Sequence, residues 1–378
     1  MWCYEVVTIT QLFDFGGDAT SMIFNVIWMV VFFVFILFFN QRMQIITYQR
    51  NVEKAVDRLQ AMSDKSREDI FKVVKPFTAE NADIRASVNN YLEFFTIEPV
   101  SLDPFGVLGR LEHILDVRRE RSMLFVSQIA PKADKHQKAN IEDVIEAATA
   151  VNYIYKVIRH YLLLGKKTKS LMVFVQLDMQ LPMIMKQAEA YYTAQRTFAA
   201  AKPIGDGLGP LVAAKFMVGS PKETIAEEVV YSQVEILGRK AYVLKAEGPG
   251  GVVGKPGEAV KQLIEKLGGK VNRVIMIDAG LKLEGENTGE VVDGVGAAIG
   301  DPGPEKFKIE DACVKYKIPL DAIICKMSLE DALTTMKKEV VESSETVYER
   351  VKQAIKERTK EGDTVIVAGI GNTMAVGQ

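Results

Sequence analysis

A carboxylate set among glycines is the feature of this sequence that most directly suggests chemistry. In the segment "GDGLGP", Asp206 stands between Gly205 and Gly207, and Gly209 follows shortly after. Glycine has no Cβ atom, so a ligand can approach the backbone closely and meet its N–H groups. A carboxylate in such surroundings suits acid–base chemistry or a divalent metal.

Two further polar, glycine-rich clusters follow apolar runs that predict strands. Asp278 ends the run "RVIMID" and is followed by an acidic loop that contains Glu286, whereas Gly369, Gly371 and Asn372 follow the last run, "TVIVAG". Ligands of open α/β sheets bind beyond the carboxyl ends of the strands. We therefore expect the three clusters to meet at one edge of a sheet.

These clusters give the predicted site. The carboxylates of these clusters, Asp206 and Asp278 among them, suit either acid–base activation of water or a divalent metal as cofactor. The predicted binding residues are Gly205, Gly207, Gly209, Gly369, Gly371, Asn372 and Glu286. The alternative for each cluster is an ordinary tight turn between a strand and a helix.

The composition excludes several other kinds of chemistry. The 378 residues carry a net charge of −2, which argues against a nucleic-acid partner. The three cysteines form no CxxC pair, which excludes a disulfide framework and a cysteine-rich zinc site. All three histidines precede residue 201, so the C-terminal half has no Ser-His-Asp or Cys-His arrangement. Water activated by carboxylates or by a metal remains.

The segment "GPGGVVGKPG", residues 248–257, resembles a phosphate-binding loop only in part. Pro249 replaces the first glycine of that motif, and Pro256 replaces its metal-binding hydroxyl group. We interpret it as a flexible glycine loop that could act as a lid.

Residues 201–378 alternate between strand and helix patterns, which predicts a three-layer α/β domain. The runs "RVIMID", "DAIICK" and "TVIVAG" are continuously apolar, as expected of a mainly parallel sheet with both faces covered. A hairpin is predicted around "GRK", and one long helix from Leu329 to about Lys360. Most of the 28 glycines fall in this part of the chain, which places a domain boundary near Lys202.

Residues 41–200 have helical patterns throughout, with helices predicted at 104–127, 140–164 and 168–199. A heptad-like seam begins at Ile45 and ends at Met62. It predicts either contacts between subunits, in a stalk of a homo-oligomer, or packing against helices of the same chain.

The uncharged run from Met22 to Phe39 predicts a transmembrane helix at 22–40. Basic residues follow it, beginning with Arg42, and acidic residues precede it. The positive-inside rule then predicts a single-pass membrane protein, with residues 1–21 outside the cell, the rest in the cytoplasm and the lipid bilayer as a partner.

The segments "GDGLGPLVA", "VIMIDAG" and "TGEVVDGVGAAIG" resemble the fold shared by the spore germination protease and the hydrogenase maturation proteases. The resemblance implies that Asp206 and Asp278 match the acidic pair that serves peptide hydrolysis in that group. They are therefore the predicted catalytic residues and the predicted ligands of a divalent metal. It also implies that Asn372 matches the group's GxGN turn. This sequence lacks the histidine of the hydrogenase proteases' metal site, and its "GIGN" lies at the C-terminus. A circular permutation that brings Asn372 beside Asp206 would reconcile this order.

The full layout also resembles an uncharacterised archaeal family of single-pass membrane proteins of about this length. That resemblance implies an architecture and no activity. Two functions follow as hypotheses: a membrane-anchored hydrolase of peptidase-like fold, or a non-catalytic scaffold that assembles subunits or binds a peptide or protein partner.

Overall fold

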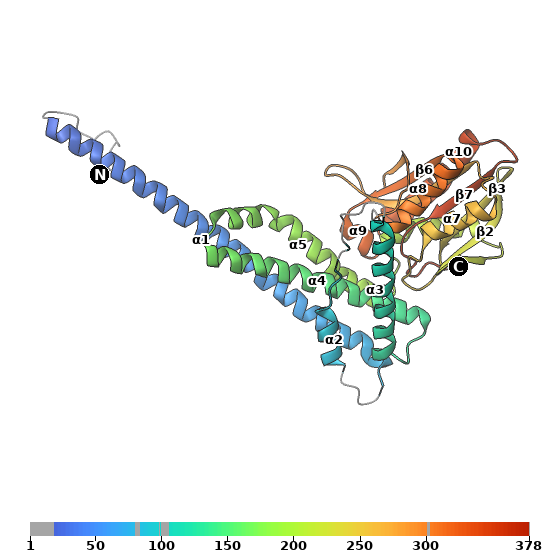
Figure 1. The fold of residues 1–378 in the computed structure, drawn as a ribbon, viewed down its shortest axis with the longest axis horizontal. Helices are drawn as coiled ribbons and strands as arrows, with labels where there is room; N and C mark the ends of the chain where they lie inside the picture. The colour runs from blue at the N-terminus through green and yellow to red at the C-terminus, as the bar shows by residue number, and fades with distance from the viewer. Residues whose placement is uncertain (1–18, 80–83, 98, 100–105, 301–302, 378) are drawn as a thin grey trace, which may run out of the picture. The chain divides into compact units, whose positions relative to one another are not determined.

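The computed structural model describes residues 19–79, 84–97, 99, 106–300 and 303–377 (Figure 1). The chain divides into two compact units. One unit holds the described residues up to Arg58 together with Lys156–Met183, and the other holds Leu59–Tyr155 with Ile184–Gln378. Three long helices contribute to both units: α1 (Ala19–Val74), α4 (Lys135–Thr168) and α5 (Leu171–Ala199).

The first unit consists of the N-terminal part of α1, the C-terminal part of α4 and the N-terminal part of α5. Asn51 of α1 donates a hydrogen bond to Asp178 of α5, with Nδ2 and Oδ1 3.0 Å apart. Val52 and Ala55 of the heptad-like seam are buried, and the seam continues with buried Leu59 in the second unit. From Val52 to Leu59 the seam is thus covered by side chains of the same chain, whereas Ile45 and Tyr48 are only half-buried.

The predicted transmembrane helix at 22–40 is wrong. Among the described residues, no helix has the length and apolar character needed to span a bilayer. The apolar run is not a separate element, because it forms the first part of the 56-residue helix α1, which continues into a segment with Arg42, Arg50 and Lys54. The predicted single-pass location, with a cytoplasmic C-terminal part, loses its support, and residues 1–18 of the predicted outer segment lie outside the described residues.

The helical part of the second unit is built around one apolar core. Helices α2 (Arg85–Leu92) and α3 (Val107–Ile129) pack with the ends of α1, α4 and α5, and a short 3-10 helix, η2 (Lys75–Phe77), follows α1. Asp134 and Gln137 exchange side-chain hydrogen bonds with each other's backbone N–H, a capping box that fixes the start of α4. Met374, near the C-terminus, is buried in the same core.

The C-terminal half contains one seven-stranded sheet with the order β1-β2-β3-β7-β4-β6-β5. The strands are β1 (Glu223–Ala226), β2 (Val229–Ile236), β3 (Arg239–Ala246), β4 (Arg273–Leu281), β5 (Val291–Val295), β6 (Leu320–Met327) and β7 (Thr364–Gly369). β3, β7, β4 and β6 are parallel neighbours, whereas β1, β2 and β5 pair antiparallel. The sheet is therefore mixed and not mainly parallel, because the hairpin β2–β3 and the short return strand β5 reverse direction at its two sides.

Helices cover both faces of this sheet, which gives the three layers. α6 (Leu208–Met217) and α10 (Lys338–Arg358) pack on one face, and α7 (Pro256–Lys266) and α8 (Pro304–Tyr316) pack on the other (Figure 1). Alternate residues of the central strand β7 enter the two cores: Val365 and Val367 one, Ile366 and Ala368 the other.

The single long helix predicted from Leu329 is two helices. A capping box of Ser328 and Asp331 starts α9 (Leu329–Leu333), and α10 begins only at Lys338. Between them Thr335 forms a β-bridge with Ile204. This bridge ties the connection to the segment that leads into Asp206, and it explains why the helix is interrupted there.

Candidate functional site: a carboxyl pair and a charged cavity

Asp206 and Asn372 lie together at the carboxyl end of the sheet. Asp206 is the middle residue of a 3-10 turn, η3 (Gly205–Gly207), that leads directly into α6. The backbone N–H of Asn372, just beyond β7, donates to Asp206 Oδ2 at 2.7 Å. The sequence-based hypothesis placed these two residues side by side, and the structure brings them together.

Asp278 lies near Asp206, and the pKa values of both carboxyl groups are raised. Asp278 is 5% exposed, and its carboxylate accepts the backbone N–H of Ala279 at 2.7 Å. Burial raises the pKa of Asp278 well above its ordinary value, and the neighbouring charge of Asp206 raises it further. Burial also raises the pKa of Asp206, although the N–H of Asn372 works in the opposite direction. We call these two residues the acidic pair.

The glycines predicted to bind a ligand are used for close packing of the backbone around the acidic pair. A Cβ atom on Gly209 would lie 2.2 Å from the carbonyl oxygen of Ile370 and 2.6 Å from that of Ile277. One on Gly371, where φ is +130°, would lie 2.0 Å from the carbonyl oxygen of Asp206. Gly205, Gly207 and Gly369 make similar close approaches to other backbone atoms. These contacts account for the glycines, and a ligand is not needed to explain them.

Glu286 belongs to a different part of the molecule's surface. It accepts a hydrogen bond from Lys326, with Oε1 and Nζ 2.5 Å apart, and another from the backbone N–H of Leu283 at 2.7 Å. These two donors lower the pKa of Glu286, with Lys326 contributing most. Glu286 stabilises the loop after β4 and contacts neither member of the acidic pair through these bonds.

Asp143 of α4 is the carboxyl group that the sequence analysis missed. The side chain of Asn372 donates from Nδ2 to Asp143 Oδ2 at 3.0 Å, so Asn372 connects Asp143 to Asp206. Burial raises the pKa of Asp143 to about 8, and Glu142, Glu146 and Asp206 raise it as well, against the hydrogen bond from Asn372. One feature of the sequence could have drawn attention to Asp143. Glu142 and Glu146, on the same helix, form an unfavourable i,i+4 pair of like charges.

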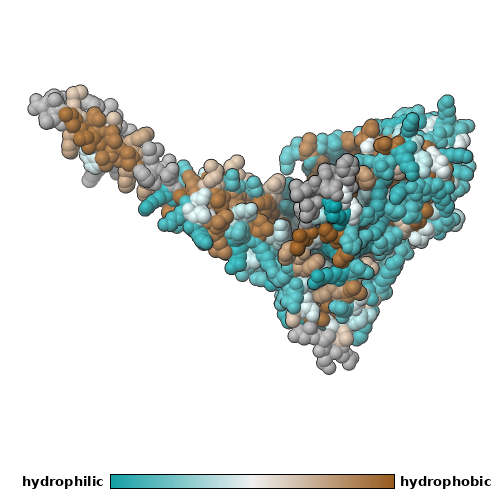
Figure 2. Space-filling model, in the orientation of Figure 1, coloured by the Kyte–Doolittle hydropathy of each residue, from teal (hydrophilic) through white to brown (hydrophobic). Residues whose placement is uncertain are grey.

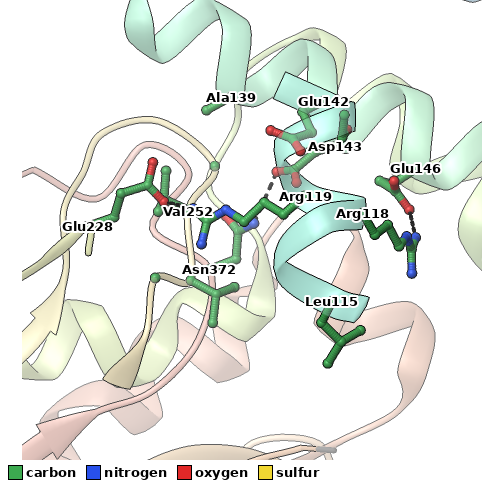
Figure 3. Close-up of a pocket in the computed structure, with 14 residues that line it drawn as sticks. Leu115, Arg118, Arg119, Ala139, Glu142, Asp143, Glu146, Glu228, Val252 and Asn372 are labelled. Carbon is green, nitrogen blue, oxygen red and sulfur yellow. Dashed lines mark hydrogen bonds and ion pairs between the residues drawn. The ribbon is translucent and has the colours of Figure 1, made fainter. Parts of the chain in front are cut away.

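Asp143 and Asn372 line a cavity of about 310 Å³, which we call the charged cavity (Figure 3). Its walls come from α3, α4, the β1–β2 turn, a glycine-rich loop and the C-terminal tail. Arg118 and Arg119 contribute from α3, and each forms an ion pair with a glutamate that also lines the cavity, Glu146 and Glu228 respectively.

The glycine-rich loop of this wall, residues 248–254, is not a free lid. Thr373 of the tail donates its N–H to the carbonyl of Val252 at 2.9 Å, and Ala375 donates to that of Pro249 at 2.9 Å. Gly251 donates its N–H to Asn140 Oδ1 of α4 at 2.8 Å. The loop is held on both sides, which corrects the interpretation of it as a flexible segment.

Lys245, at the end of β3, is a buried cation of the same sheet. It has no exposed surface, and burial lowers its pKa to about 8. Its Nζ donates to the carbonyl oxygen of Ala246 at 3.0 Å, which identifies a structural partner for the charge.

The described residues contain no group of three or more His, Cys, Asp or Glu side chains arranged to hold a metal ion. The acidic pair supplies two carboxylates and no third protein ligand among these residues. The predicted metal at Asp206 and Asp278 therefore stays a prediction.

Fold and site together define a three-layer α/β protein with a helical N-terminal half, whose carboxyl pair lies at the carboxyl side of the central strands, with Asp278 inside β4. The chain belongs to the DUF1512 family. Residues 26–201 match its model "Protein of unknown function (DUF1512) N-terminal domain", and residues 204–377 match "Domain of unknown function (DUF1512) C-terminal". A search of curated proteins found no match.

Proposed function

We propose that this protein is a hydrolase in which the acidic pair activates water to cleave a peptide bond. One observation carries the proposal: buried Asp278 and half-buried Asp206 each have a raised pKa, the charge of Asp206 raises the pKa of Asp278, and neither residue forms an ion pair within the described residues. Two neighbouring carboxyls cannot both ionise easily, so one of them keeps a proton at neutral pH. Such a pair contains an acid and a base at once.

The environments of the two residues assign the roles. Asp206 is half-buried and accepts the N–H of Asn372, which favours its ionised form, so it acts as the base. Asp278 is more deeply buried and acts as the acid. Asp206 takes a proton from water, whose oxygen attacks the amide carbonyl carbon. Asp278 then donates its proton to the leaving nitrogen as the carbon–nitrogen bond breaks, which leaves a carboxylic acid and an amine.

The resemblance to the germination and hydrogenase maturation proteases supports this proposal. The last strand, β7, occupies the centre of the sheet between β3 and β4, and its following turn lies beside Asp206. This is the arrangement expected if the fold of those proteases were circularly permuted. The proposal keeps the acidic pair of that group and replaces its metal with a shared proton.

A defined mixture of synthetic peptides, with products identified by mass spectrometry, tests the proposal. We expect Asp206→Asn and Asp278→Asn each to lower the cleavage rate by about a hundredfold or more, since general acid–base catalysis contributes roughly 10²–10⁴. Asp293→Asn is the matched control, because Asp293 is bound by Arg350 and Arg358 elsewhere on the domain. Cleavage that is unchanged in both active-site variants, or absent in the folded wild-type chain, would contradict the proposal.

A non-catalytic assembly function is the second candidate, and a different observation favours it. The large apolar side chains of α1 from Met22 to Ile36, and that of Phe39, are 43–64% exposed (Figure 2). Exposed apolar surface of this extent marks an interaction site, and a second copy of the chain could cover it in a homo-oligomer. Sedimentation analysis tests this: a monomer at all concentrations would remove the second candidate.

A further inference from the structure

The charged cavity has an imbalance of charge that its own residues do not correct. Four carboxyl groups and two guanidinium groups line it. Both guanidinium groups are already paired, Arg118 with Glu146 and Arg119 with Glu228, and Figure 3 shows Arg119 extending toward Glu228. The other two carboxyl groups, Glu142 and Asp143, have no such partner. Within the described part of the chain, neither forms an ion pair with a lysine or arginine.

A buried hydroxyl group in the same wall is poorly satisfied. Ser122 of α3 is 2% exposed and lines the cavity, and its Oγ makes no hydrogen bond of good geometry, although Glu142 and Tyr91 lie within reach of it. The Ser122 hydroxyl group interacts with the Glu142 carboxyl group and lowers its pKa, against the larger effect of burial, which raises it. A buried polar atom without a partner costs about 1–3 kcal/mol unless water or a ligand satisfies it. The cavity therefore offers three acceptors: Glu142, Asp143 and Ser122.

The size and remaining walls of the cavity fit a small organic group. About 310 Å³ is at the lower end of the range for ligand sites, and the aliphatic side chains of Leu115, Val252 and Val253 line it beside the polar ones. An ammonium group has three N–H donors and no acceptor, which complements the three acceptors of the wall. An anion would instead meet two carboxyl groups and two guanidinium groups that are already paired.

We propose that the charged cavity binds an organic ammonium group of a peptide, either its amino terminus or a lysine side chain. The ammonium group donates to Glu142, Asp143 and Ser122, and the attached carbon chain lies along the aliphatic part of the wall. Ammonium binding would specify the substrate class of the proposed hydrolase. It rests on the proposed hydrolase function only for the cleavage step. Asn372 provides the connection, since its side chain contacts Asp143 in the cavity and its N–H contacts Asp206.

Binding of the ammonium group requires ionised Asp143, and this gives a dependence on pH. The charged groups that face Asp143 are Glu142 and Glu146 of α4, Arg118 and Arg119 of α3, Glu228 of the β1–β2 turn, and Asp206 behind Asn372. The glycine-rich loop adds no charge. Because the pKa of Asp143 is about 8, affinity for a probe that stays cationic rises as pH increases from 6 toward 8, by up to about tenfold per pH unit.

Calorimetric titration of the full chain carrying Asp206→Asn tests binding separately from hydrolysis. Nα-acetyl-lysine amide presents only a side-chain ammonium group, alanyl-alanine amide presents only an α-amino group, and Nα-acetyl-norleucine amide is a neutral control. We expect at least one ammonium probe to bind about tenfold or more tightly than the neutral probe, since a hydrogen bond to a charged group is worth roughly that factor. The probe that binds identifies the source of the ammonium group.

Variants of the wall then locate the site. Asp143→Asn should weaken binding by about tenfold or more, and Ser122→Ala should weaken it less. Ser122→Ala is also the safer variant for folding, because its hydroxyl has no hydrogen bond of good geometry to lose. Asp116→Asn is the matched control, since Asp116 is also on α3 but pairs with Lys255 outside the cavity wall.

Three results would overturn the proposal. One is equal affinity for the neutral probe and the ammonium probes. Another is unchanged binding in folded Asp143→Asn and Ser122→Ala chains. The third is no binding of any ammonium probe. Binding of inorganic phosphate in its place would mean that Arg118 and Arg119 make the cavity an anion site. Loss of peptide cleavage in Asp206→Asn with binding retained would leave both proposals standing.

Discussion

Buried carboxyl groups lie toward opposite ends of the neighbouring strands β4 and β6, and their charged neighbours differ. Near the start of β6, Asp321 is 6% exposed and is bound by Arg273 at 2.6 Å and by Arg358 at 3.0 Å. Toward the carboxyl end of β4, Asp278 is 5% exposed and has Asp206 as its charged neighbour. We call the first the paired end and the second the unpaired end.

The difference separates a carboxyl group whose charge is compensated by basic side chains from one whose charge is not. A buried charge is tolerated when an opposite charge compensates it, and its removal then destabilises the fold. A buried carboxyl group without such a partner opposes folding when ionised, so a reason other than stability has to explain its presence. The unpaired end is therefore where we propose the reaction, and the following substitutions test the contrast.

The largest expected effect is at the paired end. Asp321→Asn leaves Arg273 and Arg358 without their shared carboxylate, and we expect the free energy of unfolding to fall by about 3–5 kcal/mol. Urea denaturation followed by circular dichroism measures this change. A loss below about 1 kcal/mol would mean that the paired end is not a structural ion pair in the sense used here.

The next effect comes from the glycine packing that holds the unpaired end together. Gly209→Ala places a Cβ atom against two backbone carbonyls, and we expect a loss of about 1–3 kcal/mol. Gly109→Ala in α3 is the matched control, because no atom lies within 4 Å of the added Cβ. There the change should stabilise the helix by roughly 0.5–1 kcal/mol. Similar results at both positions in the same denaturation experiment would contradict the packing account.

A substitution in the acidic pair should raise the free energy of unfolding, whereas Asp321→Asn and Gly209→Ala lower it. The pKa of Asp278 is raised in the folded state, so its contribution to stability is full below the unfolded pKa and is lost as pH rises toward the folded value. Asp278→Asn removes this loss, and at neutral pH the variant should be more stable than the wild type by about 1–3 kcal/mol. The advantage should shrink as pH falls toward 4. A variant that is destabilised at all pH values would contradict the account.

The smallest effect is expected at Glu286. Its carboxylate pairs with Lys326 at the surface, where solvent screens the charges, so Glu286→Gln should leave stability and peptide cleavage within experimental error of the wild type. A clear loss of cleavage in a folded Glu286→Gln chain would return this residue to the site.

The sequence was informative where local patterns determine the structure. The glycine turns and apolar runs placed Asn372 after a buried strand and Asp206 before a helix, and the predicted hairpin is that of β2 and β3, which pair from Val229↔Ala246 to Ile236↔Arg239. The sequence was uninformative about Asp143, because its role depends on α4 packing against a loop and a tail more than 100 residues away. It misled at Met22–Phe39, where apolar character alone predicted a membrane span.

The acidic residues after β4 show a further limit of prediction from sequence patterns. Glu286 and Asp293 lie in a glycine-rich segment like that of Asp206, but each has basic partners from distant elements, Lys326 for the first and Arg350 and Arg358 for the second. Only tertiary structure distinguishes a carboxyl group that is compensated from one that is not.

The protonation state of the unpaired end at neutral pH is the central claim, and infrared difference spectroscopy measures it most directly. The band of a protonated carboxyl group should persist at pH 7 in the wild-type chain, diminish in Asp278→Asn and in Asp143→Asn, and remain in Asp321→Asn measured under conditions in which that variant is folded. A wild-type spectrum in which every carboxyl group has lost its proton by about pH 5 would contradict the account.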